Sequence, residues 1–122
     1  MAKILIVEDD AIMQKIYHKK FELEAFEVET AGDGEEALKK VKSFMPDFVL
    51  MDVMLPKLNG IEALQRIKAD PETARIPILV LSNLSTTDDA QTAKEKGAIG
   101  YIVKSDVTPS QVVAKVKQIL KI

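Results

Sequence analysis

Residues 4–10 of the chain are Ile-Leu-Ile-Val-Glu-Asp-Asp, four apolar residues followed directly by three acids. A short apolar run that is rich in β-branched residues is typical of a strand buried on both faces, as strands of parallel sheets are. Three acids after such a strand would lie at its carboxyl end. The segment therefore predicts a parallel sheet with an acidic edge.

Four more strand-like segments follow, separated by longer amphipathic stretches. Residues 48–51, 78–81 and 101–103 are apolar throughout, whereas residues 26–31 alternate between apolar and polar. In the intervening stretches apolar residues recur at helical spacing, as Met13, Tyr17 and Phe21 do with Ile12 and Ile16 beside them. Five strand–helix units predict an α/β fold, in which right-handed crossovers place helices on both faces of a doubly wound sandwich.

Several helix ends can also be predicted. Thr108 and Pro109 fit the N-cap and the first residue of the last helix. Thr86 with Asp89 three residues later resembles a capping box for the fourth helix, and Gly97 would end that helix.

Length and composition limit the kinds of protein that the chain can be. It has 122 residues, of which 47% are hydrophobic and 30% charged, as expected for one globular domain over residues 1–122. Cys is absent, which excludes disulfides and thiol chemistry. The sequence has neither an apolar run long enough to span a bilayer nor a signal-peptide layout at Met1. A net charge of -2 provides no general attraction to nucleic acid or membranes, so we expect a cytoplasmic protein.

The polar residues that follow the strands are the candidates for a functional site. In open α/β sheets, ligands bind outside the carboxyl ends of the strands. The residues at these positions are Glu8, Asp9, Asp10, Asp52, Ser82 and Lys104. We expect Asp10 to cap the first helix and the other five residues to form the site.

Carboxylates gathered at one edge repel each other, and a divalent cation relieves this repulsion. Mg²⁺ prefers oxygen ligands and commonly uses a few protein carboxylates together with water and phosphate oxygens. We expect Asp9 and Asp52 to be direct ligands and Glu8 to act through water. A carboxylate in such a site can attack phosphorus, while Ser82 and Lys104 hold the phosphoryl oxygens.

Four segments resemble the signature segments of response-regulator receiver domains from two-component signalling systems. In order along the whole chain they are Ile4–Asp10 (ILIVEDD), Val49–Pro56 (VLMDVMLP), Ile78–Ser82 (ILVLS) and Tyr101–Lys104 (YIVK). The resemblance implies a flavodoxin-like (βα)5 sandwich whose five parallel strands have the order 2-1-3-4-5, with residues 1–122 forming one receiver domain.

The resemblance also implies a role for each site residue. Asp52 would accept a phosphoryl group from a histidine kinase or a histidine phosphotransfer protein. Glu8, Asp9, Asp52 and the carbonyl of Met54 would bind Mg²⁺. Lys104 would pair with the phosphate, and Ser82 and Tyr101 would be the switch residues.

A receiver domain of this kind is not an enzyme with a separate substrate, although it promotes its own slow dephosphorylation. Phosphorylation would change the surface formed by the fourth helix, the fifth strand and the fifth helix. That surface would bind a downstream protein of unknown identity, and the chain would be a monomer or a phosphorylation-dependent dimer.

The chain departs from the family pattern near the site. Ser105 replaces a proline that is often preceded by a cis bond. A cis bond before serine would cost about 2.5–4 kcal/mol, so we expect a trans bond or a rearranged loop there. Asn83 stands where a smaller residue is usual. Met54 and Leu84 are apolar at positions that tune dephosphorylation in the family, and we hypothesise that they disfavour an ordered attacking water and lengthen the phosphorylated lifetime.

Three other functions compete with this interpretation. A flavodoxin-like FMN protein has the same topology, but three acids after the first strand would repel the FMN phosphate. A hydrolase of the haloacid-dehalogenase type would need a second Asp two residues after Asp52, where Met54 stands. A receiver-like interaction domain that works without phosphorylation stays open, and Mg²⁺ titration with beryllofluoride would distinguish it.

Overall fold

The computed structural model describes residues 1–83 and 87–122, in which strands and helices alternate. In chain order the elements are β1 (Lys3–Val7), α1 (Ala11–Leu23), β2 (Glu27–Ala31), α2 (Gly34–Phe44), β3 (Phe48–Met51), α3 (Gly60–Ala69), β4 (Ile78–Ser82), α4 (Thr87–Glu95), β5 (Gly100–Val103), the 3-10 helix η1 (Lys104–Asp106) and α5 (Pro109–Leu120).

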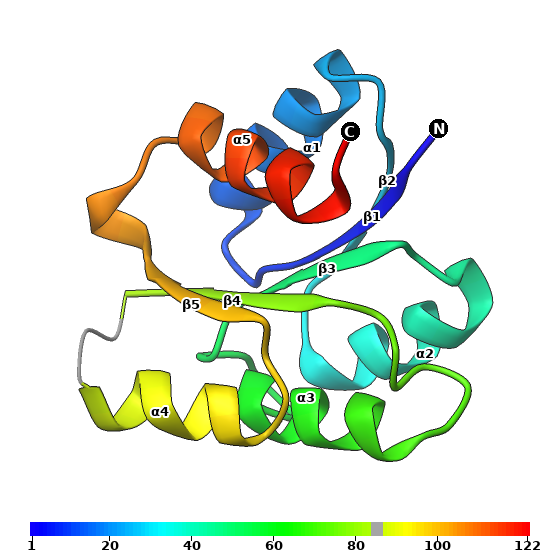
Figure 1. The fold of residues 1–122 in the computed structure, drawn as a ribbon, viewed down its shortest axis with the longest axis vertical. Coiled ribbons are helices and arrows are strands. Elements are labelled where there is room, and N and C mark those ends of the chain that lie inside the picture. Colours follow the sequence, from blue (N-terminus) through cyan, green and yellow to red (C-terminus); the bar gives the residue numbers. More distant parts are fainter. Residues whose placement is uncertain (84–86) are drawn as a thin grey trace.

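The strands form one parallel sheet in the order β2-β1-β3-β4-β5. Helices α1 and α5 cover one face, and α2, α3 and α4 cover the other (Figure 1). This is the flavodoxin-like doubly wound sandwich that the sequence predicts. The order changes direction between β1 and β3, which is the point where ligands bind in folds of this type.

The apolar runs of the three central strands are explained by two separate cores. Along β1, Ile4 and Ile6 belong to the core under α1 and α5, whereas Leu5 and Val7 belong to the core under α2, α3 and α4. Every residue of β3 and β4 is buried. Because successive side chains of a strand point to opposite faces, a sheet covered on both faces needs apolar residues at every position.

The two edge strands are less buried. In β2 exposed and partly buried residues alternate until Ala31, which matches the alternating sequence of that segment. All four residues of β5 are partly buried. The edge position of β5 leaves one of its sides available for contacts outside the sheet.

Helix α1 buries a narrower stripe than its sequence suggests. Tyr17 and Phe21 lie in the core and Met13 packs against it. Ile12 and Ile16 are 71% and 42% exposed, so they do not belong to this stripe. Residues next to each other in a helix lie about 100° apart around its axis, which turns Ile12 and Ile16 away from the sheet.

The predicted helix ends agree with the structure where the structure describes them. The Asp10 carboxylate accepts hydrogen bonds from the backbone N–H groups of Ile12 and Met13, at 2.9 and 3.2 Å. Thr108 forms a capping box with Gln111. Gly97 lies just beyond α4 with φ of 109°, a backbone conformation that favours glycine. The expected cap at Thr86 lies outside the described residues.

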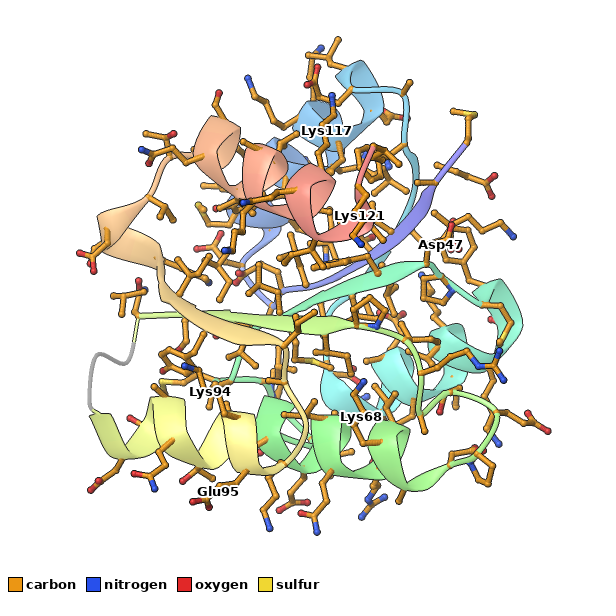
Figure 2. The ribbon with its side chains drawn as sticks, in the orientation of Figure 1. Asp47, Lys68, Lys94, Glu95, Lys117 and Lys121 are labelled. Carbon is orange, nitrogen blue, oxygen red and sulfur yellow. The ribbon has the colours of Figure 1, made fainter. Side chains whose placement is uncertain are left out.

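Two further contacts join elements at the amino end of the strands. Lys117 of α5 forms an ion pair of 3.0 Å with Glu24 at the end of α1, and Asp47 accepts a 2.8 Å hydrogen bond from the N–H of Lys3 (Figure 2).

The bond between Lys104 and Ser105 is trans, as expected. Within the described ranges, no helix has the length and apolar character that crossing a membrane requires.

Helix α1 ends in a Schellman motif that contains a strained residue. The N–H of Phe26 donates to the carbonyl of Phe21, and the N–H of Ala25 donates to that of Glu22, each at 3.0 Å. The two phenylalanine rings meet edge to face with centroids 5.0 Å apart. Ala25 has φ of 66°, in the left-handed region where a Cβ costs about 1–2 kcal/mol.

Replacing Ala25 by Gly should therefore raise the free energy of unfolding. Relief of the left-handed strain contributes about 1–2 kcal/mol, whereas the greater conformational freedom of glycine in the unfolded chain costs about 0.4–1 kcal/mol. The expected increase in the free energy of unfolding is therefore about 0.5–1 kcal/mol. Urea denaturation measures it. The same change at the exposed Ala114, inside α5, should cost about 1 kcal/mol. A loss at both positions would contradict the account of the motif.

Candidate functional site

The pairing of β1 with β3 brings two acids together at the end of the sheet. Val7 is the partner of Met51 in the register, so Glu8 and Asp52 follow directly at neighbouring positions. The N–H of Asp52 donates to the carbonyl of Val7 at 3.0 Å. Both acids are buried, with only 4% of Glu8 and 7% of Asp52 exposed.

The ammonium of Lys104 lies between these two carboxylates. Its Nζ is 2.8 Å from Oδ2 of Asp52 and also donates to Oε2 of Glu8. Lys104 begins η1 directly after β5, and its side chain is 11% exposed. One cation therefore bonds to two carboxylates from other strands in a largely buried position.

The pKa shifts show how the single ammonium is shared. Burial alone would lower the pKa of Lys104, but hydrogen bonds and charge attraction from Asp52 and Glu8 raise it. Burial raises the pKa of Glu8, and the hydrogen bond and charge of Lys104 offset this only in part. A carboxyl group with a raised pKa contributes stability that is lost as the pH rises through that pKa. Ionised Glu8 thus lowers the stability of the folded state at neutral pH, and further positive charge nearby would offset this loss.

Asp9 completes an acidic cluster on the solvent side. Glu8, Asp9 and Asp52 each offer one carboxylate oxygen, and these three oxygens lie within 4.8 Å of one another. Two oxygens bound to one Mg²⁺ at about 2.0–2.1 Å are at most about 4.2 Å apart, so small side-chain rotations suffice. Three carboxylates and one ammonium leave a net charge of -2. The donor set and its charge therefore fit a divalent cation.

The two predicted switch residues are in contact with each other. Ser82 is the last residue of β4 and is fully buried. Tyr101 lies on β5, partly buried against the core under α2, α3 and α4, and its hydroxyl hydrogen-bonds with Ser82. Burial raises the pKa of Tyr101, and this hydrogen bond acts in the opposite direction. A change in the position of Ser82 would thus directly alter a hydrogen bond to the edge strand β5.

The loop after β3 is folded tightly around Asp52. The N–H of Met54 donates to Oδ1 of Asp52 at 3.2 Å, and the N–H of Gly60 donates to the carbonyl of Val53 at 2.8 Å. The Met54 side chain points outward and is 63% exposed. The backbone of Met54 thus lies beside the Asp52 carboxylate, although its side chain does not.

Two glycines are needed for this loop, and the sequence interpretation did not identify them. A Cβ on Gly60 would lie 1.9 Å from the carbonyl oxygen of Asp52, and one on Gly34 would lie 1.9 Å from that of Leu58. Gly60 also begins α3 right after its N-cap Asn59, where glycine is a poor helix former. A glycine at this unfavourable position indicates, already in the sequence, that another part of the backbone lies very close to it.

All the predicted site residues that are described lie at this edge of the sheet. The structure brings together Glu8, Asp9, Asp52 and Lys104, and it places Ser82 and Tyr101 beside each other. Leu84, which we expect to influence dephosphorylation, lies outside the described residues.

Comparison with known proteins agrees with this geometry. A family model described as the response regulator receiver domain matches residues 4–117. The alkaline phosphatase synthesis transcriptional regulatory protein PhoP of Bacillus subtilis is 39% identical over 119 residues, which are 98% of this chain and 48% of that protein. The chain spans about half the length of the curated relatives it matches.

Solved structures have the same fold. The chemotaxis protein CheY4 of Vibrio cholerae has a TM-score of 0.90 at 30% identity, covering 97% of this chain and 98% of that one. A Mn²⁺-bound form of the response regulator Rcp1 has a TM-score of 0.83 at 26% identity, covering 96% of this chain and 92% of that one. The match extends over nearly the whole of each structure.

Substitution of Gly60 tests the packing of the loop. Replacing it by Ala should push the backbone of Asp52 away and lower the free energy of unfolding by about 1–3 kcal/mol. Gly32→Ala is the control, because the nearest atom to a Cβ there is 4.0 Å away. Chemical denaturation of both variants measures the difference. Equal stabilities would show that the contact between Gly60 and Asp52 is not restrictive.

Proposed function

Since the chain belongs to the response regulator receiver domain family, we propose that Asp52 accepts a phosphoryl group from a histidine kinase or a histidine phosphotransfer protein. Receiver domains are signalling domains, not enzymes with a separate substrate. The observation that carries the proposal is the position of Asp52, whose carboxylate lies in the acidic cluster and 2.8 Å from the Lys104 ammonium.

The chain's own groups would hold Mg²⁺ at this cluster. Asp9 and Asp52 would be direct ligands, together with the carbonyl of Met54, and Glu8 would act through water. When bound, the ion would neutralise charge on the carboxylates and on the incoming phosphoryl oxygens. The support for this comes from the spacing of the three carboxylates and their net charge with Lys104.

Asp52 is the nucleophile of the proposed transfer. One of its carboxylate oxygens forms a bond to phosphorus while the bond between phosphorus and the donor's imidazole nitrogen breaks, and that nitrogen keeps the electron pair. Lys104 donates to the developing phosphoryl charge, for which it is already oriented by its bond to Asp52. Because Lys104 also bonds to Glu8, it stays at the site when one Asp52 oxygen becomes the bridging oxygen of an acyl phosphate.

Ser82 and Tyr101 would report the new state. A phosphoryl oxygen on Asp52 offers Ser82 a hydrogen-bond partner with more charge than the Tyr101 phenol has. A shift of Ser82 toward it would change the bond that the two residues now share. Tyr101 lies on the edge strand, so the surface of α4, β5 and α5 would change and bind a downstream protein differently.

Several finer expectations stay predictions. These are the cytoplasmic location, the lack of direct binding to nucleic acid or membranes, and the monomer or phosphorylation-dependent dimer. The extent of residues 1–122 as one receiver domain and the slow self-catalysed loss of phosphate are also predictions.

Incubation with acetyl phosphate and Mg²⁺ tests the acceptor. Mass spectrometry should find one acid-stable, base-labile phosphoryl adduct on the wild-type chain and none on Asp52→Asn, because an amide is too weak a nucleophile for the transfer. Asp47→Asn is a matched control at the other end of the sheet (Figure 2) and should still form the adduct. An equal adduct on Asp52→Asn would defeat the assignment.

The lifetime of the adduct tests the two apolar positions. Met54, Val53 and Ile61 line an apolar groove beside Asp9, which provides few hydrogen bonds for a water that would attack the adduct. Met54→Asn combined with Leu84→Glu should speed the loss of phosphate several-fold, as measured by the decay of the adduct after the donor is removed. An unchanged decay rate would reject the idea.

A further inference from the structure

Three large apolar side chains lie on the solvent side of α1. Ile12 and Leu23 are each 71% exposed, and Ile16 is 42% exposed. Successive residues of a helix are about 100° apart, so these three side chains lie within about 40° of one another around the axis. They form a stripe about 16 Å long that points away from the sheet, on the side opposite the buried Tyr17 and Phe21. The core of the domain does not need this stripe.

Lysines lie on both sides of the apolar stripe. Lys15, Lys19 and Lys20 line a shallow groove together with Ile16 and Leu23. Long lysine side chains pack their stems on apolar groups while their ammonium groups stay in a polar environment. The outer surface of α1 is therefore both basic and apolar, which is typical of helices that lie on a membrane surface.

The neighbouring helix α5 extends the positive charge. Helices α1 and α5 lie side by side over one face of the sheet (Figure 1). Together with their C-cap residues, Glu24 and Lys121, they carry six lysines and two glutamates, a net charge of +4. Figure 2 shows Lys117 and Lys121 on this side of the sheet and Lys94 on the other. We call this surface the α1/α5 face, and its lysines are Lys15, Lys19, Lys20, Lys115, Lys117 and Lys121.

The charge of the molecule is thus unevenly distributed. The whole chain has a net charge of -2, so a charge of +4 on the α1/α5 face leaves -6 on all other residues. The expectation that the chain does not bind membranes rests on the net charge alone, which describes a surface of even charge. That expectation does not apply to a face whose own charge is strongly positive.

We propose that the α1/α5 face docks on a membrane surface that contains anionic phospholipids, with Ile12, Ile16 and Leu23 inserted among the headgroups. Clusters of four to eight or so basic residues on an amphipathic helix attract acidic headgroups. The exposed apolar side chains supply the second contribution that stable binding to a membrane surface needs.

An acidic helix of a partner protein is the competing occupant of this face. One helix is about 10–12 Å wide with its side chains, whereas the lysines extend over two adjacent helices. A broad anionic surface therefore matches the face better than a single helix does. Docking through this face would leave the acidic cluster accessible, because the cluster lies at the carboxyl edge of the sheet.

Cosedimentation of the full chain with lipid vesicles tests the charge. The wild-type chain should bind vesicles with about 30% phosphatidylglycerol in phosphatidylcholine, but not pure phosphatidylcholine, and about 0.5 M salt should release it. Lys15→Gln with Lys19→Gln should weaken binding about 25-fold, since each lysine near an anionic surface contributes about fivefold. The matched control is Lys94→Gln with Lys96→Gln, which removes two exposed lysines at the end of α4 and should leave binding unchanged.

A second pair of variants tests the apolar stripe. Ile12→Ser with Leu23→Ser should weaken vesicle binding several-fold without affecting folding, because both side chains are largely exposed. Ile99→Ser is the control, since Ile99 is 51% exposed but lies outside the α1/α5 face, between α4 and β5. Circular dichroism checks that all variants are folded.

The outcomes separate the alternatives. Failure of the wild-type chain to bind acidic vesicles, or an equal effect of the two lysine pairs, would overturn the proposal. Binding of a synthetic helical peptide of Glu and Leu, without binding of vesicles, would overturn it in favour of a protein partner. Asp52→Asn should bind vesicles as the wild-type chain does, so this result does not depend on whether Asp52 accepts a phosphoryl group.

Discussion

The ammonium of Lys104 lies between the carboxylates of Glu8 and Asp52, and this contact joins the ends of β1, β3 and β5. Without it, two buried carboxylates would face each other at neighbouring positions of the sheet. With it, the cluster still has a net charge of -2 once Asp9 is included. Lys104 therefore offsets part of the repulsion between the two buried acids, and the remaining negative charge has the sign that attracts a divalent cation.

The rest of the molecule positions these groups. Two apolar cores fix the register of the central strands, and that register places Glu8 beside Asp52. The close approach of Gly60 to the Asp52 carbonyl fixes the loop after β3. Tyr17 of α1 lines a small cavity together with Glu8 and Asp52. The packing on both faces of the sheet thus positions the side chains of one small polar site.

Much of this was predictable from the sequence, because strands buried on both faces and residues at strand ends leave strong patterns. The runs 4–7, 48–51 and 78–81 predicted the central strands, and the polar residues after the strands predicted which side chains gather at one edge of the sheet. Contacts between elements were less visible. The exposure of Ile12 and Ile16 depends on how α1 is rotated against the sheet. The need for Gly60 and the sharing of Lys104 between two acids depend on tertiary distances that spacing along the chain does not specify.

The central claim is that the acids at the ends of β1 and β3 form one divalent-cation site. Titration with Mn²⁺ followed by nuclear magnetic resonance tests it most directly, because a bound paramagnetic ion broadens the signals of nearby amides. The account predicts that the amide signals of residues 8–10 and 52–54 disappear first and that Mg²⁺ restores them. Persistence of these signals while those near other acids, such as Glu72 or Asp88, disappear would contradict it.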